Sequence, residues 1–280
     1  MRLLSLIFAS LWAASVGWAE TMVLASTTST QNSGLYDYLL PLFEADTGIS
    51  VRVVAVGTGQ AIRIAQNGDA DALLVHHRPS EDAFINEGYG SQRFDVMYND
   101  FVIVGPKEDA AGVSSTLTLQ DAMTSLHQSE AAFVSRGDES GTHKREQSLW
   151  NKAQLAPEGD WYREIGAGMG AALNMAASID AYTLSDRGTW LSFGNKQNLT
   201  VLFEGETELL NPYGLVLLNT ERFPHVKSEA AMTFAAWLTS ERGQDAIGAF
   251  RVENAQLFCP NAKNEQELDK KYCPAQGLLD

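Results

Sequence analysis

Short apolar runs and longer amphipathic segments alternate through the first third of the chain. Residues 22–25, 51–56 and 71–76 are rich in aliphatic and β-branched side chains, a pattern that predicts three strands. After each run come Gly, Ser, Thr or Pro residues and then a segment with helical periodicity. Repeated strand, loop and helix are typical of a parallel sheet with helices on both faces. In such sheets ligands bind beyond the carboxyl ends of the strands, where helices begin.

Two long extended runs, residues 94–105 and 211–218, enclose a second set of α/β elements. Between them the pattern predicts strands over residues 132–135 and 181–184, and helices that begin near residues 141 and 170. We therefore expect an α/β protein with two lobes, each with a central, mainly parallel sheet flanked by helices, joined by a hinge of two segments. The predicted lobe I covers residues 20–102 and 211–280, and the predicted lobe II covers residues 103–210.

The last part of lobe I has a helical pattern over residues 228–250. Its apolar face carries Ala230, Phe234, Trp237 and Leu238. The chain then ends in a polar tail, residues 258–280.

Residues 1–19 have the pattern of a secretory signal peptide. Arg2 precedes an apolar stretch over residues 3–16, and Gly17 and Ala19 supply the small residues of a cleavage site. The stretch is shorter than the roughly 20 apolar residues that a transmembrane helix needs. We therefore expect an exported protein.

Composition and charge narrow the class of protein further. Hydrophobic residues make up 45% and charged residues 20% of the 280 residues, which are values of a globular protein. Thirty-five acidic and twenty basic side chains give a net charge of −15. A nucleic-acid-binding protein normally has the opposite sign, because it must neutralise phosphates. The charge therefore excludes that class.

The chain has two cysteines, Cys259 and Cys273, both in the polar tail. In an exported protein such a pair predicts a disulfide. The chain-entropy model gives about 3 kcal/mol for closing a loop of this size. A metal site is the weaker alternative, because no His or third Cys lies nearby in the sequence.

Four loops combine hydroxyl or glycine residues directly before predicted helices, at residues 26–30, 57–59, 135–142 and 166–170. Backbone N–H groups at a helix start attract anions, and each helix dipole adds about 0.3–1 kcal/mol. Arg136 adds a positive charge with a planar fork suited to oxyanions. The loops together predict a site for a negatively charged ligand.

Other interpretations of these residues remain open. Ser and Thr before a helix are often only caps. The residues Gly57 and Gly59 do not form a dinucleotide fingerprint, because Ile62 stands where a third Gly is needed. Ser140 with His143 as base would suit an exported hydrolase, although no acidic residue at useful spacing would orient the base.

The adjacent histidines His76 and His77 suggest a zinc site. Neighbouring residues on a strand point to opposite faces, so the two side chains cannot easily share one ion. We expect one to pack at the end of the strand and the other to face solvent, and we predict no metal ligands.

Three motifs together resemble one family. STTST over residues 26–30, SRGDESGTH over residues 135–143, and GMGAALNMAASIDAYTLSDRGTW over residues 168–190 are similar to the tungstate-binding periplasmic proteins of ABC importers. The resemblance covers essentially the whole mature chain. It implies the two-lobed type II periplasmic-binding-protein fold, which closes on one tetrahedral oxyanion and delivers it to a permease.

The resemblance also implies the site. The ligand contacts carried over by position are Thr27, Thr28, Thr58, Arg136, Ser140 and Thr142, with backbone N–H groups near Gly141 and Gly170. The implied ligand is tungstate, with molybdate as a second candidate, and no cofactor is expected. The expected partners are an ABC permease and its ATPase, the expected location is the periplasm, and the expected state is a monomer. The alternatives are a binder of another tetrahedral oxyanion (sulfate or phosphate), an exported serine hydrolase that uses Ser140, and a sensor with the same fold.

The protonation state of the ligand separates tungstate from phosphate. Phosphate near neutral pH often keeps a proton and gains from a carboxylate acceptor, whereas tungstate, molybdate and sulfate offer acceptors only. Residues 75–78 contain no Asp or Glu at the place where a phosphate-binding protein is expected to carry that acceptor. The sequence therefore favours a proton-free oxyanion over phosphate.

Overall fold

The computed structural model describes residues 20–262. Its strands are β1 (Thr21–Thr27), β2 (Ser50–Val56), β3 (Ala72–Val75), β4 (Gly90–Pro106), β5 (Phe133–Ser135), β6 (Tyr162–Glu164), β7 (Thr183–Asp186), β8 (Leu199–Phe203), β9 (Leu210–Leu218), β10 (Arg251–Val252), β11 (Ala255–Gln256) and β12 (Cys259–Pro260). Its α-helices are α1 (Thr28–Asn32), α2 (Leu35–Thr47), α3 (Thr58–Gln66), α4 (Arg78–Asn86), α5 (Leu119–Ser129), α6 (Gly141–Lys152), α7 (Met169–Ile179), α8 (Arg187–Ser192), α9 (Ser228–Thr239) and α10 (Glu241–Ala249). Short 3₁₀ turns cover Val113–Ser115 and Thr207–Leu209.

The predicted signal peptide lies outside the described residues, and so does Cys273. Its predicted partner Cys259 is buried on β12, which pairs with β4. The disulfide therefore stays a prediction. In the described part of the chain, none of the helices has the length and apolar character needed to cross a membrane.

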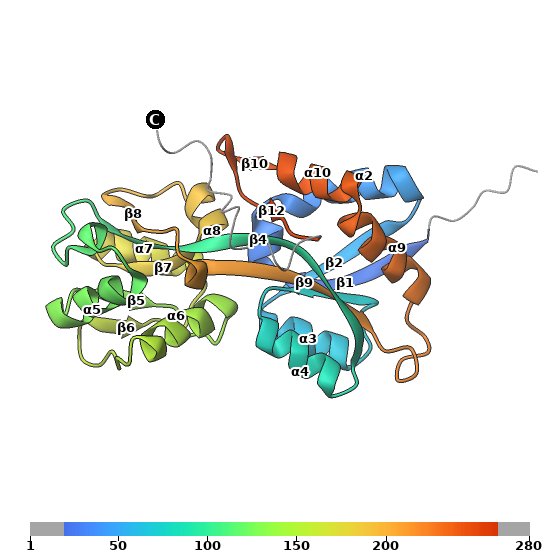
Figure 1. Ribbon diagram of the computed structural model, residues 1–280, viewed down its shortest axis with the longest axis horizontal. Coiled ribbons are helices and arrows are strands. Elements are labelled where there is room, and N and C mark those ends of the chain that lie inside the picture. The colour runs from blue at the N-terminus through green and yellow to red at the C-terminus, as the bar shows by residue number, and fades with distance from the viewer. Residues whose placement is uncertain (1–19, 263–280) are drawn as a thin grey trace, which may run out of the picture.

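The first three strands form the predicted parallel sheet. β1 lies between β2 and β3 and is parallel to both, and β9 extends the sheet antiparallel to β3. Side chains alternate between the two faces of the sheet: Leu24 and Leu74 belong to one hydrophobic cluster, and Ala25 and Leu73 belong to another. Helices α2, α9 and α10 cover the first face, and α3 and α4 cover the second (Figure 1).

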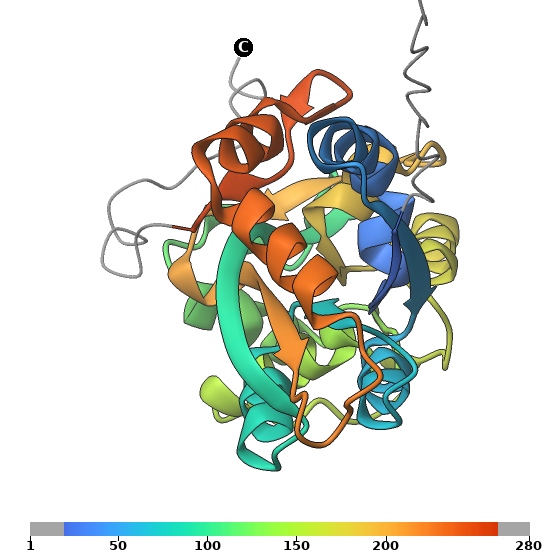
Figure 2. The same ribbon diagram turned by 90° about the vertical axis from the view of Figure 1, so that its right-hand side faces the viewer.

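Strand β4 connects the two halves of the molecule. Its first part, up to Asp100, pairs antiparallel with β9, and its last part pairs with β7 and β8. The strand is strongly curved (Figure 2) and contacts α9. With β9 beside it, β4 forms the two-segment connection between the halves, which confirms the predicted fold class (Figure 1).

The second half is a smaller α/β unit. β5 pairs parallel with β6, and Phe133 forms a parallel bridge to Tyr182 just before β7. One hydrophobic cluster lies under α5 and α6, and another lies under α7 and α8. The predicted lobe boundaries fall inside β4 and at the start of β9, and they remain a prediction.

The segment over residues 228–250 is helical as predicted, but it is not one continuous helix. The structure has two helices, because Ser240 leaves the helical conformation and its side chain accepts a hydrogen bond from Gly243 N. A Cβ on Gly243 would lie 2.1 Å from the carbonyl oxygen of Trp237, so the close approach of the two helices requires glycine. A continuous apolar pattern does not reveal such a cap.

Candidate functional site

The carboxyl ends of five strands converge between the two halves. β1, β2 and β3 are parallel and end at one edge of their sheet, where α1, α3 and α4 begin. In the other half β5 and β7 run parallel to each other, and α6 and α8 follow their ends. The N-termini of several helices therefore face a common space, which suits an anion.

The starts of α3 and α6 meet directly at Gly141. A Cβ built on Gly141 would lie 3.1 Å from His76 Cε1 and 3.5 Å from Thr58 Oγ1. Thr58 is the first residue of α3 and is buried. A side chain at position 141 would therefore be crowded against His76, so glycine suits this close approach of the two halves.

The loop after β1 presents a group of hydroxyls. Thr27 caps α1, and its buried Oγ1 lies 2.8 Å from Thr30 Oγ1 and 3.1 Å from Ser29 Oγ. Thr28, the first residue of α1, is exposed. Of these, Thr28 has the hydroxyl most accessible to a ligand from solution, whereas Thr27 already has local partners.

Arg136 follows β5 and is paired with Asp138. Its Nε and one terminal nitrogen donate to Asp138 Oδ2 at 3.1 and 2.5 Å, and its other terminal nitrogen lies 3.4 Å from Thr142 Oγ1. The other oxygen of Asp138 accepts from Ser140 N at 3.1 Å. Burial acts to raise the pKa of Asp138, but hydrogen bonds from Ser140 and the charge of Arg136 outweigh it and lower the pKa. The carboxylate therefore holds the guanidinium beside the start of α6.

His76 links the connecting strands to the loop after β1. Its Nδ1 lies 3.0 Å from Asn211 Oδ1 on β9, and its Nε2 lies 3.2 Å from Ser29 Oγ. Asn211 Nδ2 donates to Asn99 Oδ1 on β4. Asn211 Oδ1 thus accepts from His76 Nδ1, and Nε2 accepts from the Ser29 hydroxyl. Burial lowers the pKa of His76 and keeps the ring neutral near pH 7.

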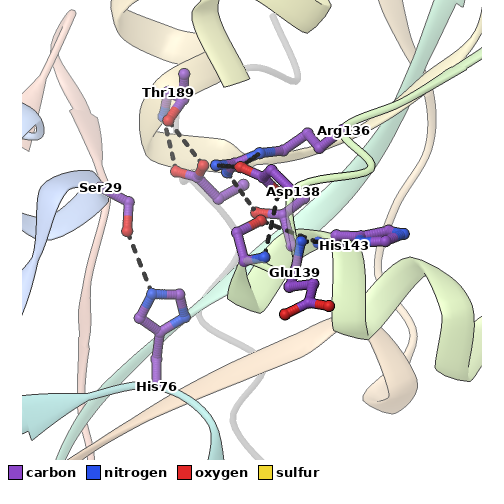
Figure 3. A network of polar contacts seen from close by, with 10 residues as sticks. Ser29, His76, Arg136, Asp138, Glu139, His143 and Thr189 are labelled. Carbon is purple, nitrogen blue, oxygen red and sulfur yellow. Dashed lines mark hydrogen bonds and ion pairs between the residues drawn. The ribbon is translucent and has the colours of Figure 1, made fainter. Parts of the chain in front are cut away.

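Figure 3 shows Ser29 and His76 on one side of the space and Arg136, Asp138, Glu139 and His143 on the other. Thr189, at the start of α8, lies near the Arg136 side. The labelled side chains thus come from both halves of the molecule.

Two carboxylates border the space, and sequence reasoning did not place them there. Asp138 is occupied by Arg136 and Ser140. Asp186 ends β7 and is buried, and its two oxygens accept from Thr189 N at 2.9 Å and from Thr189 Oγ1 at 2.7 Å. Each carboxylate already has donors on both oxygens. The spacing of Asp186 and Thr189, which is typical of an N-cap, was the available signal in the sequence.

The structure brings most of the predicted site residues together, but some of them cap a helix or are exposed instead of contacting another site residue. Thr58 and Gly141 meet, and Arg136 lies beside Thr142. Ser140 serves as the cap of α6 by accepting from His143 N. Gly170 is exposed on the first turn of α7, and its loop joins the site through the bond from Ala167 N to Arg136 O. Sequence reasoning missed Ser29 and the role of His76, because their partners are distant in sequence.

The arrangement around Ser140 does not suit a nucleophile. His143 Nδ1 accepts from the backbone N–H of Glu139 at 3.1 Å, and its Nε2 lies 3.5 Å from Glu164 Oε1. Neither ring nitrogen is therefore placed to take a proton from the Ser140 hydroxyl. Within residues 20–262, no three His, Cys, Asp or Glu side chains are grouped so that they could hold a metal ion.

Comparisons with known proteins agree with this architecture. A family model described as a PBP superfamily domain matches residues 14–242. The chain is 45% identical over 246 residues to the tungstate-binding protein TupA of Peptoclostridium acidaminophilum, with 86% of this chain and 86% of that protein covered. The chain belongs to the TupA family.

Two solved structures are similar to this TupA-family chain in fold as well as in sequence. The tungstate-binding protein TupA from Desulfovibrio alaskensis G20 has a TM-score of 0.81 and 43% identity, covering 88% of this chain and 100% of that chain. The structure titled as the tungstate ABC transporter from Geobacter sulfurreducens has a TM-score of 0.77 and 47% identity, covering 82% and 99%. These likenesses confirm the predicted type II fold and the predicted family. The relatives are binding proteins and not enzymes, so the hydrolase alternative does not hold.

Proposed function

We propose that this protein binds tungstate between its two halves and delivers it to an ABC importer in the periplasm. The single observation that carries the proposal is the meeting of the α3 and α6 starts at Gly141, with the Arg136 guanidinium beside α6. The names of the TupA relatives support tungstate as the ligand. The proposed contacts are Thr27, Thr28, Thr58, Arg136, Ser140, Gly141, Thr142 and Gly170.

The two carboxylates at the site bear on the protonation state of the ligand. A phosphate that keeps a proton gains from a carboxylate that accepts it. Asp138 and Asp186 already accept hydrogen bonds from Arg136, Ser140 N and Thr189 on both oxygens. Both carboxylates therefore hold donors of the protein in place, and we propose that the ligand is an oxyanion that offers acceptors only, such as tungstate, molybdate or sulfate.

Local donors outweigh the net negative charge of the protein. Exposed charges farther away than about 8 Å are largely screened at physiological ionic strength. Arg136 and the N–H groups at the helix starts act at contact distance, where the effective dielectric is lower. Tight binding of a dianion is therefore compatible with a net charge of −15.

Thermal unfolding with each oxyanion tests the proposal. A ligand at 100 times its Kd stabilises the folded state by about 2.7 kcal/mol, so tungstate at micromolar concentration should raise Tm by several degrees. Molybdate is the second candidate, and we expect sulfate and phosphate to act only in large excess. The same titration on Arg136→Ala is the control. An equal rise in Tm with phosphate at low concentration would contradict the proposed ligand class.

The proposed partners follow from the same family. A binding protein of an ABC importer docks on a permease that an ATPase drives. We propose that this protein docks on the permease from the periplasm, that the ATPase drives the permease, and that the protein acts as a monomer.

A further inference from the structure

A second pocket lies on the other side of Gly141 from Arg136. It has a volume of about 120 Å³, which is the space of a few water molecules at about 30 Å³ each. We call it the hinge pocket, and it is lined by His76, His77, Arg78, Pro79, Phe101, Gly141, Lys144, Arg145, Ser148, Asn211 and Pro212. Part of its lining comes from β4 and β9, which connect the two halves.

One face of α6 forms the basic side of the hinge pocket. Gly141, Lys144, Arg145 and Ser148 are spaced so that they share a helix face. Thr142 is turned away from this face and lies beside Arg136. A Cβ built on Gly141 would lie 3.1 Å from His76 Cε1, so these two lining residues lie close together at the edge of the hinge pocket.

Arg78, one of the cations that line the hinge pocket, is paired with Asp82 at 2.8 Å, whereas Lys144 and Arg145 form no ion pair among the described residues. Among residues 20–262, no carboxylate lines the pocket, and Lys144 forms no ion pair. Arg145 donates a hydrogen bond to the carbonyl oxygen of Leu210 at 3.1 Å, and its guanidinium lies over the ring of Phe101. The carboxylate that acts on Arg145 from farther away is Glu208, which is paired with Lys152.

Electrostatic evidence agrees with a positive potential inside the pocket. The pKa of His77 is lowered to about 4, first by burial and then by nearby positive charge, of which Lys144 and Arg145 are the permanently charged sources. Burial also lowers the pKa of Arg145. Partly buried cations without an ion-pair partner are costly for a protein, and a bound anion would remove that cost.

We propose that the hinge pocket binds a second small inorganic oxyanion, held by Lys144 and Arg145 together with the Ser148 hydroxyl. The apolar lining from Pro79, Phe101 and Pro212 limits access of water and strengthens these contacts. The charge pattern of the pocket selects a dianion such as sulfate or hydrogen phosphate. This site goes beyond the proposed tungstate function, because it uses a different face of α6.

Amide NMR of the mature protein tests the proposal with sulfate as the probe. The protein is first saturated with tungstate, and sodium sulfate is then added at constant ionic strength and pH 7.5. We expect saturable shifts of the amides of Gly141, Lys144 and Ser148. Lys144→Gln should weaken the apparent affinity about tenfold, the loss expected for one charge-assisted hydrogen bond, and Lys144→Arg should keep most of it.

Lys152→Gln is the matched control, because Lys152 lies on the same helix but is exposed and paired with Glu208. It should leave sulfate binding unchanged. Shifts that stay linear in sulfate, or that saturate equally in Lys144→Gln, would overturn the proposal. If tungstate does not bind, the tungstate-free titration still separates the two sites: shifts confined to Arg136 and Thr142 overturn the second site, whereas shifts at Lys144 and Ser148 support it.

Discussion

At the scale of single residues, the pairing of Arg136 with Asp138 defines how the site is built. The carboxylate holds two of the guanidinium nitrogens, and the third points to Thr142. Arg136 thus has a fixed orientation before a ligand arrives, which reduces the entropy that binding would cost. Because of this pairing, a variant without Arg136 would leave the Asp138 carboxylate unpaired next to the bound anion.

Arg136→Ala should therefore weaken tungstate binding at least about tenfold. A charge-assisted hydrogen bond contributes about 1.5–3 kcal/mol, and about 1.4 kcal/mol corresponds to tenfold in Kd. Arg136→Lys should recover only part of the affinity, because an ammonium lacks the planar fork. Isothermal titration calorimetry gives the ranking.

The double variant Arg136→Ala/Asp138→Asn separates lost attraction from new repulsion. It should bind more tightly than Arg136→Ala alone, because the stranded negative charge is gone. Arg163→Ala, which changes an exposed arginine elsewhere in the same half, is the matched control and should bind like the wild type. Wild-type affinity of Arg136→Ala together with a lower Tm would show that Arg136 has only a structural role.

At the scale of elements, helix α6 borders both proposed anion sites, and it also carries a buried glutamate, Glu146. Glu146 is buried, and its Oε1 accepts from Tyr162 OH at 2.7 Å and from Trp150 Nε1 at 3.3 Å. Burial raises the pKa of Glu146 from 4.5 to about 7, more than the hydrogen bonds lower it. The folded state therefore holds a proton that the unfolded chain releases at lower pH.

Stability should consequently fall as pH rises from about 4.5 through 7. The loss is about 2–3 kcal/mol, since each pKa unit corresponds to about 1.4 kcal/mol. Glu146→Gln keeps an acceptor oxygen and removes the titration, so its urea midpoint should change less between pH 5 and pH 8. Equal pH slopes for the wild type and the variant would contradict the raised pKa.

At the scale of the whole molecule, the C-terminal segment returns to the strand that joins the two halves. Cys259 pairs with Tyr98 of β4, and Pro260 pairs with Met97. A disulfide from Cys259 to Cys273 would fasten the polar tail near this connecting strand. Such a bond acts on the whole chain, because it reduces the freedom of the unfolded state.

Both cysteines should be oxidised in protein purified from the periplasm. Replacing both with Ser should lower the free energy of unfolding by about 2–4 kcal/mol. Either single Cys→Ser variant should lose nearly as much, because either change removes the same bond. Mass spectrometry of alkylated native and denatured protein checks the oxidation state, and two alkylated thiols in the native sample would refute the bond.

The sequence alone determined the features that local pattern controls. Alternating apolar runs located β1, β2, β3 and the long strands β4 and β9, because side-chain periodicity follows directly from backbone geometry. The loop from Arg136 to Thr142 was also visible, since a cation and hydroxyls before a helix are close in sequence. The break at Ser240 was not, because the cap depends on how α9 and α10 pack.

Only the tertiary structure decided what surrounds those loops. His76 meets Asn211 across 135 positions of sequence, and Arg187 meets Asp100 across 87. Such contacts depend on the register of β4 and β9, which local preference does not fix. The hydrogen-bonded oxygens of Asp138 and Asp186 arise in the same way, and so do Lys144 and Arg145, which form no ion pair in the part of the chain that the structure describes. The fold brings these charges together, and their neighbours then decide which of them remain available to a ligand.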